Sequence, residues 1–86
     1  MGQDEIERNL GVQPLDGILT EFALGNHDLV AASEEPMTHK AVQRGRKGRR
    51  LTKHMKQRMA DALNRAVTLQ GKTVERAWGV SDLFTY

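Results

Sequence analysis

The chain has 86 residues, with 13 lysines and arginines against 11 aspartates and glutamates, and it has no cysteine. This length allows one small domain, and the lack of cysteine excludes a disulfide scaffold, a cysteine-based zinc site and thiol catalysis. No apolar run approaches the roughly 20 residues that span a bilayer, and the polar start MGQDEIERNL does not resemble a signal peptide. We therefore expect a cytoplasmic protein that makes no contact with membranes.

The net charge of +2 hides a strong asymmetry along the chain. Nine of the 13 basic residues lie between residues 38 and 60, and all 11 acidic residues lie outside that range. A basic block of this kind suits a polyanionic partner better than a neutral one. The alternative is a solvated helix face without a partner, and charge alone does not decide between the two.

Residues 1–12 contain two glycines, several charges and no apolar period, which is typical of a flexible acidic arm. After them, apolar residues recur on one helix face, at Leu15, Ile18, Leu19, Phe22 and Ala23. Pro14 suits the first helical position and Gly25 suits the position after the end. The pattern predicts a helix over residues 14–24.

Three further helices are predicted downstream. Asn26 is a good N-cap for a short helix over residues 27–33, which the segment EEP terminates. Thr38 caps the next helix, HKAVQRGRK, which ends at the C-cap glycine Gly48. Its core-facing positions are Met37, Ala41, Val42 and Gly45. Thr52 caps the longest helix, which ends near Gly71 and carries an apolar stripe of Met55, Met59, Ala62, Leu63, Ala66 and Val67.

The C-terminal segment KTVERAWGVSDLFTY holds three of the four aromatic residues. Ser81 is expected to cap one helical turn there, and Trp78, Phe84 and Tyr86 are expected to close the core. An exposed surface for a second copy is the alternative. No strand pattern competes with the helices. The predicted fold is all-α: residues 13–86 form a single small four-helix domain with a short C-terminal turn.

The sequence lacks the residue patterns that catalysis or metal binding would need. The three histidines do not have the spacing of metal ligands, and no HExxH occurs. Phosphate-loop and dinucleotide-binding glycine motifs are also absent. We expect a protein that is not an enzyme and that binds no metal and no cofactor.

The second and third predicted helices and the turn between them form a helix-turn-helix pattern over residues 26–48. The outward positions of its second helix are expected to contact base edges through His39, Lys40, Gln43 and Arg44. The end of that helix and the following segment are expected to bind phosphate through Arg46, Arg49, Arg50, Thr52, Lys53 and Lys56. Glu34 and Glu35, in the turn before this helix, are expected to repel phosphate.

The segment MTHKAVQRGRKGRRLTKHMKQRMADALN also carries a family likeness. Met37-Thr38, Val42, RKGRR and MADALN resemble the second half of the lambda-repressor/Cro-like helix-turn-helix family, and NHDLVAAS is similar to its preceding helix. The likeness covers residues 26–64 and implies a lambda-repressor-like fold. By position it implies base reading by His39, Lys40 and Arg44, and contacts with the DNA backbone by His27 and Lys47. Short bacterial proteins that keep this module and end in an aromatic tail are similar too.

Together these features predict a bacterial, nucleoid-associated protein that binds double-stranded DNA and regulates transcription. Residues 38–47 would enter the major groove and residues 46–56 would clamp phosphates. A homodimer fits this function, because one small domain makes few specific contacts. Two alternatives stay open. One is an antitoxin-like or adaptor module that binds a protein partner through Trp78, Phe84 and Tyr86, and the other is RNA binding.

Overall fold

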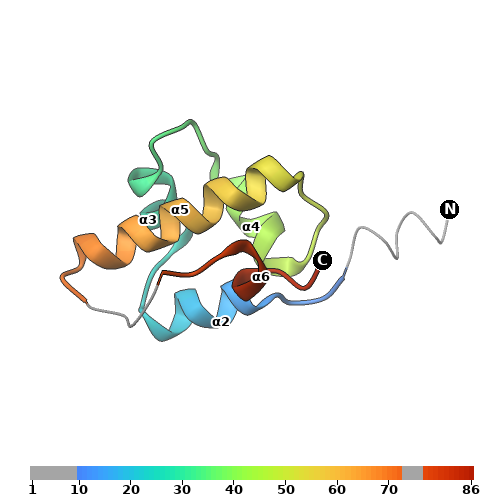
Figure 1. Ribbon diagram of the computed structural model, residues 1–86, viewed down its shortest axis with the longest axis horizontal. Helices are drawn as coiled ribbons and strands as arrows, with labels where there is room; N and C mark the ends of the chain where they lie inside the picture. The colour runs from blue at the N-terminus through green and yellow to red at the C-terminus, as the bar shows by residue number, and fades with distance from the viewer. Residues whose placement is uncertain (1–9, 73–76) are drawn as a thin grey trace, which may run out of the picture.

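The computed structural model describes residues 10–72 and 77–86, and its regular secondary structure there is entirely helical. The elements are α2 (Pro14–Glu21), α3 (Asn26–Ala32), α4 (His39–Lys47), α5 (Lys53–Leu69) and α6 (Val80–Leu83) (Figure 1). This confirms the all-α prediction, with four main helices and a short C-terminal one. Most of the predicted arm, residues 1–9, lies outside the described residues. Within the described part, none of the helices has the length and apolar character needed to cross a membrane.

The long helix α5 runs across the molecule, and the other helices gather along it (Figure 1). α3 packs against both α5 and α4, while α2 packs against α4 and α6. The short α6 also contacts α5, so the C-terminal segment lies between α2 and α5. This arrangement leaves one face of α4 and the beginning of α5 at the surface.

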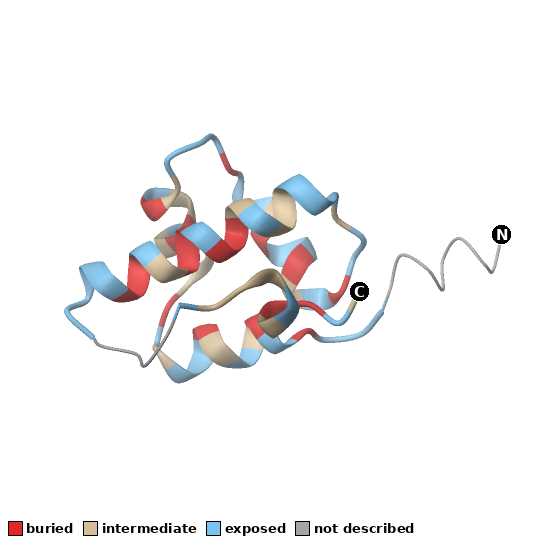
Figure 2. Ribbon diagram, in the orientation of Figure 1, coloured by how far each residue is buried: buried red, intermediate tan, exposed pale blue. Residues whose placement is uncertain are grey.

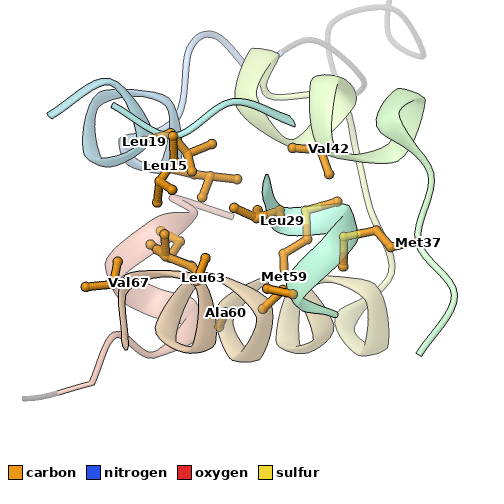
Figure 3. Packing of buried hydrophobic residues seen from close by; sticks show 14 of the residues in the cluster. Leu15, Leu19, Leu29, Met37, Val42, Met59, Ala60, Leu63 and Val67 are labelled. Carbon is orange, nitrogen blue, oxygen red and sulfur yellow. The ribbon is translucent and has the colours of Figure 1, made fainter. Parts of the chain in front are cut away.

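Every helix contributes buried residues to one apolar core (Figure 2), and their side chains converge there (Figure 3). Leu15 and Leu19 enter it from α2, and Leu29 enters it from α3. Burial of one such side chain stabilises the fold by about 1.5–3 kcal/mol. The predicted stripe of α5 is largely confirmed, since only Met55 among its six members is half-buried rather than buried. The largest fully buried side chains from α4, α5 and α6 are Val42, Met59, Leu63, Val67 and Leu83.

Three of the four predicted helix starts are confirmed, since α2 begins at Pro14 and threonines cap α4 and α5. Thr38 Oγ1 accepts the Ala41 N–H at 3.0 Å, and Thr52 Oγ1 accepts the Met55 N–H at 3.1 Å. The prediction of Asn26 as an N-cap is wrong, because Asn26 is already the first helical residue and Gly25 is the N-cap. The physical reason is Asp28, whose Oδ2 accepts the Gly25 N–H at 2.7 Å.

The predicted cap at Ser81 is wrong for the same reason. The N-cap of α6 is Gly79, and its backbone N–H donates to Asp82 Oδ2 at 2.8 Å. In both short helices, the carboxylate of the aspartate three residues after the N-cap accepts the backbone N–H of the N-cap residue. A glycine can therefore take the cap position without a capping side chain of its own.

The helix ends show one recurring geometry. At α4, Gly48 has φ +85°, and the N–H groups of Gly48 and Arg49 donate to the carbonyls of Gly45 and Arg44. This is the Schellman motif, which needs a left-handed residue. Gly71 ends α5 in the same way with φ +78°. Both endings confirm the expected glycines.

The end of α2 differs from the prediction. The helix stops at Glu21 rather than at residue 24, because Ala23 takes the left-handed conformation with φ +56°. The Leu24 N–H donates to the Leu19 carbonyl at 2.8 Å and the Ala23 N–H donates to the Thr20 carbonyl at 3.1 Å. Ala23 is consequently exposed, although its spacing placed it on the buried face. The turn brings Leu24 into the core.

The aromatic tail closes the core, as predicted. Phe84 is buried, and the ring of Trp78 meets Phe22 edge-on, with 5.3 Å between ring centroids. The Asn64 side chain holds the tail by pairing with both the N–H and the carbonyl of Trp78, at 2.8 and 2.9 Å. The tail is therefore part of the fold and not a separate appendage.

Candidate nucleic-acid interface

The outer face of α4 carries the residues that the sequence assigned to base reading. Val42 and Gly45 are buried on the inner side of this helix, whereas His39, Lys40, Gln43, Arg44 and Lys47 are all exposed. Gly45 allows the inner side to approach the core closely, because a Cβ built on it would lie 2.9 Å from Met59 Sδ and 3.2 Å from Leu51 Cδ1. The absence of this side chain lets the inner side of α4 lie against Met59 and Leu51, with its polar face outward.

A loop of basic residues continues from the end of α4 to the start of α5. Arg49, Arg50, Thr52 and Lys53 are exposed, while Leu51 packs against the core and anchors the loop. Thr52 uses its hydroxyl to cap α5, whose first N–H groups therefore face the same side. A helix start of this kind favours negative charge.

Three adjoining hollows join these two segments into one continuous surface. The first, of about 330 Å³, lies between α4 and the start of α5 and includes Lys40, Arg44 and Arg50 in its lining. The second shares Lys40 and Arg44 with it, and the third shares Arg50. No acidic residue lines any of the three among the described residues. We call this the basic surface, and its polar residues are Thr38, Lys40, Gln43, Arg44, Lys47, Arg49, Arg50, Thr52, Lys53, Lys56 and Tyr86.

The acidic residues of the turn before α4 are paired with another part of the molecule. Glu35 Oε1 lies 2.8 Å from Arg58 NH2, and Glu34 Oε2 lies 3.0 Å from Arg65 NH2, both on α5. Arg58 NH1 also donates to the Pro36 carbonyl at 2.9 Å. The two negative charges are therefore offset by arginines of α5, and neither carboxylate lines the basic surface. The expected repulsion of phosphate by Glu34 and Glu35 is weakened accordingly.

Arg46 points away from the basic surface, although the sequence assigned it to phosphate. Its Nε donates to Asp16 Oδ1 at 2.6 Å and its NH1 donates to Asn26 Oδ1 at 2.8 Å. Its side chain is only 20% exposed. The guanidinium thus ties α4 to α2 and to the start of α3, which is a bracing role.

His27 and Lys56 differ in where the structure places them. The His27 side chain is exposed, lies 3.3 Å from Asp28 and does not line the basic surface. Lys56 does line it, but its ammonium also donates to the Tyr86 carbonyl oxygen at 2.6 Å and lies 4.3 Å from the centre of the Tyr86 ring. Lys56 therefore joins the C-terminal segment to the basic loop.

Both ends of the described chain hold the basic loop in place, which the sequence did not indicate. The Leu10 N–H donates to the Gly48 carbonyl at 2.9 Å, so the last residues of the predicted arm contact the end of α4. From the other end, the Tyr86 hydroxyl donates to the Arg49 carbonyl at 2.9 Å. Burial raises the pKa of this hydroxyl above its ordinary value of 10.0. These contacts fix the loop backbone from both sides.

A buried glutamine links the two chain ends. Gln13 is 2% exposed, its N–H donates to the Arg46 carbonyl, and its Oε1 accepts from both the N–H and the hydroxyl of Thr85. Such a side chain is recognisable only in three dimensions, because its partners lie 33 and 72 positions away along the sequence.

Comparisons with protein-family models, with curated proteins and with solved structures each found no match. Among the described residues, no group of three or more histidines and carboxylates could hold a metal ion.

Proposed function

We propose that the protein binds double-stranded DNA, with α3 and α4 acting as a helix-turn-helix pair and α4 entering the major groove. One observation carries this proposal: the exposed face of α4 is continuous with the basic loop and the start of α5, without an acidic residue in the lining. A helix such as α4 is about 10–12 Å across with its side chains. The major groove, about 12 Å wide, admits one helix of this kind.

The residues proposed to contact DNA fall into two groups, one placed to meet the base edges in the groove and one placed to meet the sugar–phosphate backbone beside it. His39, Lys40, Gln43 and Arg44 lie on the face of α4 that would meet base edges, where arginine and lysine recognise guanine. Lys47 and the basic loop lie beside them, where a sugar–phosphate backbone would pass. No described carboxylate pairs with Lys40, Arg44, Lys47, Arg49 or Lys53. These cations need not break an ion pair with a described carboxylate before they bind phosphate.

The two alternative functions gain less support from the geometry. A protein partner at the aromatic tail would need exposed rings, yet Phe84 is 3% exposed and Trp78 packs on Phe22. Single-stranded RNA usually stacks its bases on aromatic side chains. Tyr86 is the described aromatic residue that lines the basic surface, and the Lys56 ammonium lies over its ring. A duplex, bound through its backbone and groove, makes no such demand.

The test is a titration of the protein with mixed-sequence duplex DNA at low salt, followed residue by residue through backbone NMR shifts. We expect shifts along α4 and residues 49–56, and none around Glu34 and Arg65. Arg44→Ala should weaken binding, and Arg65→Ala is the matched control because Arg65 is also an exposed arginine but pairs with Glu34. Absence of binding at low salt, or shifts confined to the Glu34–Arg65 region, would rule out the proposed function.

A further inference from the structure

A chain of hydrogen bonds runs from α2 to the exposed face of α4. Arg46 donates to Asp16 Oδ1 through Nε and to Asn26 Oδ1 through NH1. Asn26 Nδ2 in turn donates to Gln43 Oε1 at 3.0 Å. The chain therefore begins at a half-buried ion pair between α2 and α4 and ends on an exposed glutamine of the basic surface.

The chemistry of arginine sets the direction of every bond in this chain. A guanidinium has only donors, so the Asn26 atom that faces Arg46 must be its carbonyl oxygen. The other end of the Asn26 amide is then the NH₂ group, and its partner on Gln43 must be an acceptor. Gln43 consequently turns its carbonyl oxygen toward Asn26. Its own NH₂ group, with two donors, is left for a ligand.

We propose that Asn26 is a positioning residue that fixes the Gln43 amide with its donor side outward, so that Gln43 selects bases presenting hydrogen-bond acceptors. This inference rests on the proposed binding of duplex DNA. In the major groove the acceptors are N7 of either purine, O6 of guanine and O4 of thymine, whereas adenine N6 and cytosine N4 are donors. A freely rotating glutamine could present either side, but the Arg46–Asn26 chain permits one.

This mechanism predicts that the selection can be inverted without touching Gln43. In Asn26→Asp, one carboxylate oxygen still accepts from Arg46, and the other oxygen can now only accept from Gln43. The Gln43 amide would rotate, donate its NH₂ to residue 26 and turn its carbonyl oxygen outward. Gln43→Glu reaches the same outcome differently, because Asn26 binds one carboxylate oxygen and leaves the second as an outward acceptor.

The experiment is a selection from a pool of randomised duplexes by the wild type, Asn26→Asp, Gln43→Glu and Gln43→Ala, each first shown to unfold cooperatively. The base pair at which Gln43→Ala loses its sequence preference is the one that Gln43 contacts in the wild type. There we expect the wild type to disfavour cytosine, the one base without a major-groove acceptor, by about 2- to 12-fold, the range one hydrogen bond supports. Both acidic variants should instead favour cytosine at that same position, because its N4 group is a donor. The added negative charge lowers the affinity for all sequences alike, so base ratios within each selection are compared.

The outcomes separate this inference from the function on which it rests. If the wild type binds no duplex at low salt, the proposed function fails and the inference with it. If the wild type binds duplex DNA, but Asn26→Asp keeps the wild-type base preference at the position where Gln43→Ala loses it, the positioning role of Asn26 is refuted and DNA binding stands. The positioning role would also be refuted if the wild type and Gln43→Ala had the same base preference at every position.

Discussion

Replacement of Arg46 by alanine separates bracing from phosphate binding within the basic segment. The side chain makes two charge-assisted hydrogen bonds, at 2.6 and 2.8 Å, which join α4 to α2 and α3. Hydrogen bonds to charged groups contribute about 1.5–3 kcal/mol when they are shielded. The Asp16 side chain is 36% exposed, which screens the pair. We therefore expect Arg46→Ala to lower the free energy of unfolding by about 2 kcal/mol.

For a domain of this size, about 2 kcal/mol corresponds to a fall in Tm of roughly 8–16 °C. Thermal and urea unfolding followed by far-UV circular dichroism measure it directly. Arg49→Ala is the matched control, because Arg49 is an exposed arginine three residues later whose side chain pairs with no described carboxylate. It should leave Tm within about 2 °C of the wild type.

For the binding of duplex DNA the order should be reversed, so that Arg49→Ala has the larger effect and Arg46→Ala the smaller one. Loss of one phosphate contact makes the negative slope of log affinity against log salt less steep by about 0.9. We expect this change for Arg49→Ala and not for Arg46→Ala, compared at a temperature where both are folded. An Arg46→Ala variant that is as stable as the wild type and has the reduced slope would refute the bracing role.

Three further predictions concern the backbone and the tail. Ala23→Gly should raise the free energy of unfolding, measured in urea, by about 0.5–1 kcal/mol. The left-handed conformation at φ +56° is unfavourable for alanine but not for glycine, and the methyl group that is lost is exposed. A destabilised variant would contradict the assigned helix end. Gly48→Ala should cost more than about 2 kcal/mol in the same assay, because its Cβ would lie 1.9 Å from the Gly11 carbonyl oxygen and φ is +85°. Gly45→Ala should be milder, because its closest clash is with the Met59 thioether and alanine is the better helix former, and an equal loss for both would argue against the packing of residue 11 on α4. The Tyr86 hydroxyl is neutral in both the folded and the unfolded chain well below pH 10, and as the pH rises it ionises first in the unfolded chain, because burial raises its pKa in the folded chain. Stability should therefore fall as pH rises above 10, and Tyr86→Phe should flatten that part of the pH–stability curve.

Much of the fold could be predicted from periodicity and capping residues. The core stripe of α5, the threonine caps of α4 and α5, and the glycines that end them follow from local rules that apply within one or two turns. The errors came where a local rule had two candidates. Asn26 and Ser81 are good caps by residue type, but the carboxylates of Asp28 and Asp82 close the helices one or two residues earlier. Ala23 in a left-handed conformation carries no sequence signal, because that position is normally glycine.

The candidate site was predictable in part for a related reason. The helical period correctly placed the exposed face of α4, because its five outward residues follow from the buried positions Val42 and Gly45. The period did not show that Arg46 turns toward Asp16, 30 residues earlier, or that Tyr86 and Leu10 hold the basic loop. Those contacts join distant parts of the chain, and the charge of an arginine is the same whether it braces the fold or binds phosphate.

The proposed function requires the basic surface to bind duplex DNA through several phosphate contacts. The most direct measurement is the affinity for a mixed-sequence duplex across a series of salt concentrations. Lys47, Arg49, Arg50, Lys53 and Lys56 would neutralise up to five phosphates, which gives a slope of log affinity against log salt of about −4 to −5. We expect a slope in that range, reduced to about −3 when Arg49 and Lys53 are both replaced by alanine. A slope near zero, or a double variant with the slope of the wild type, would contradict the claim.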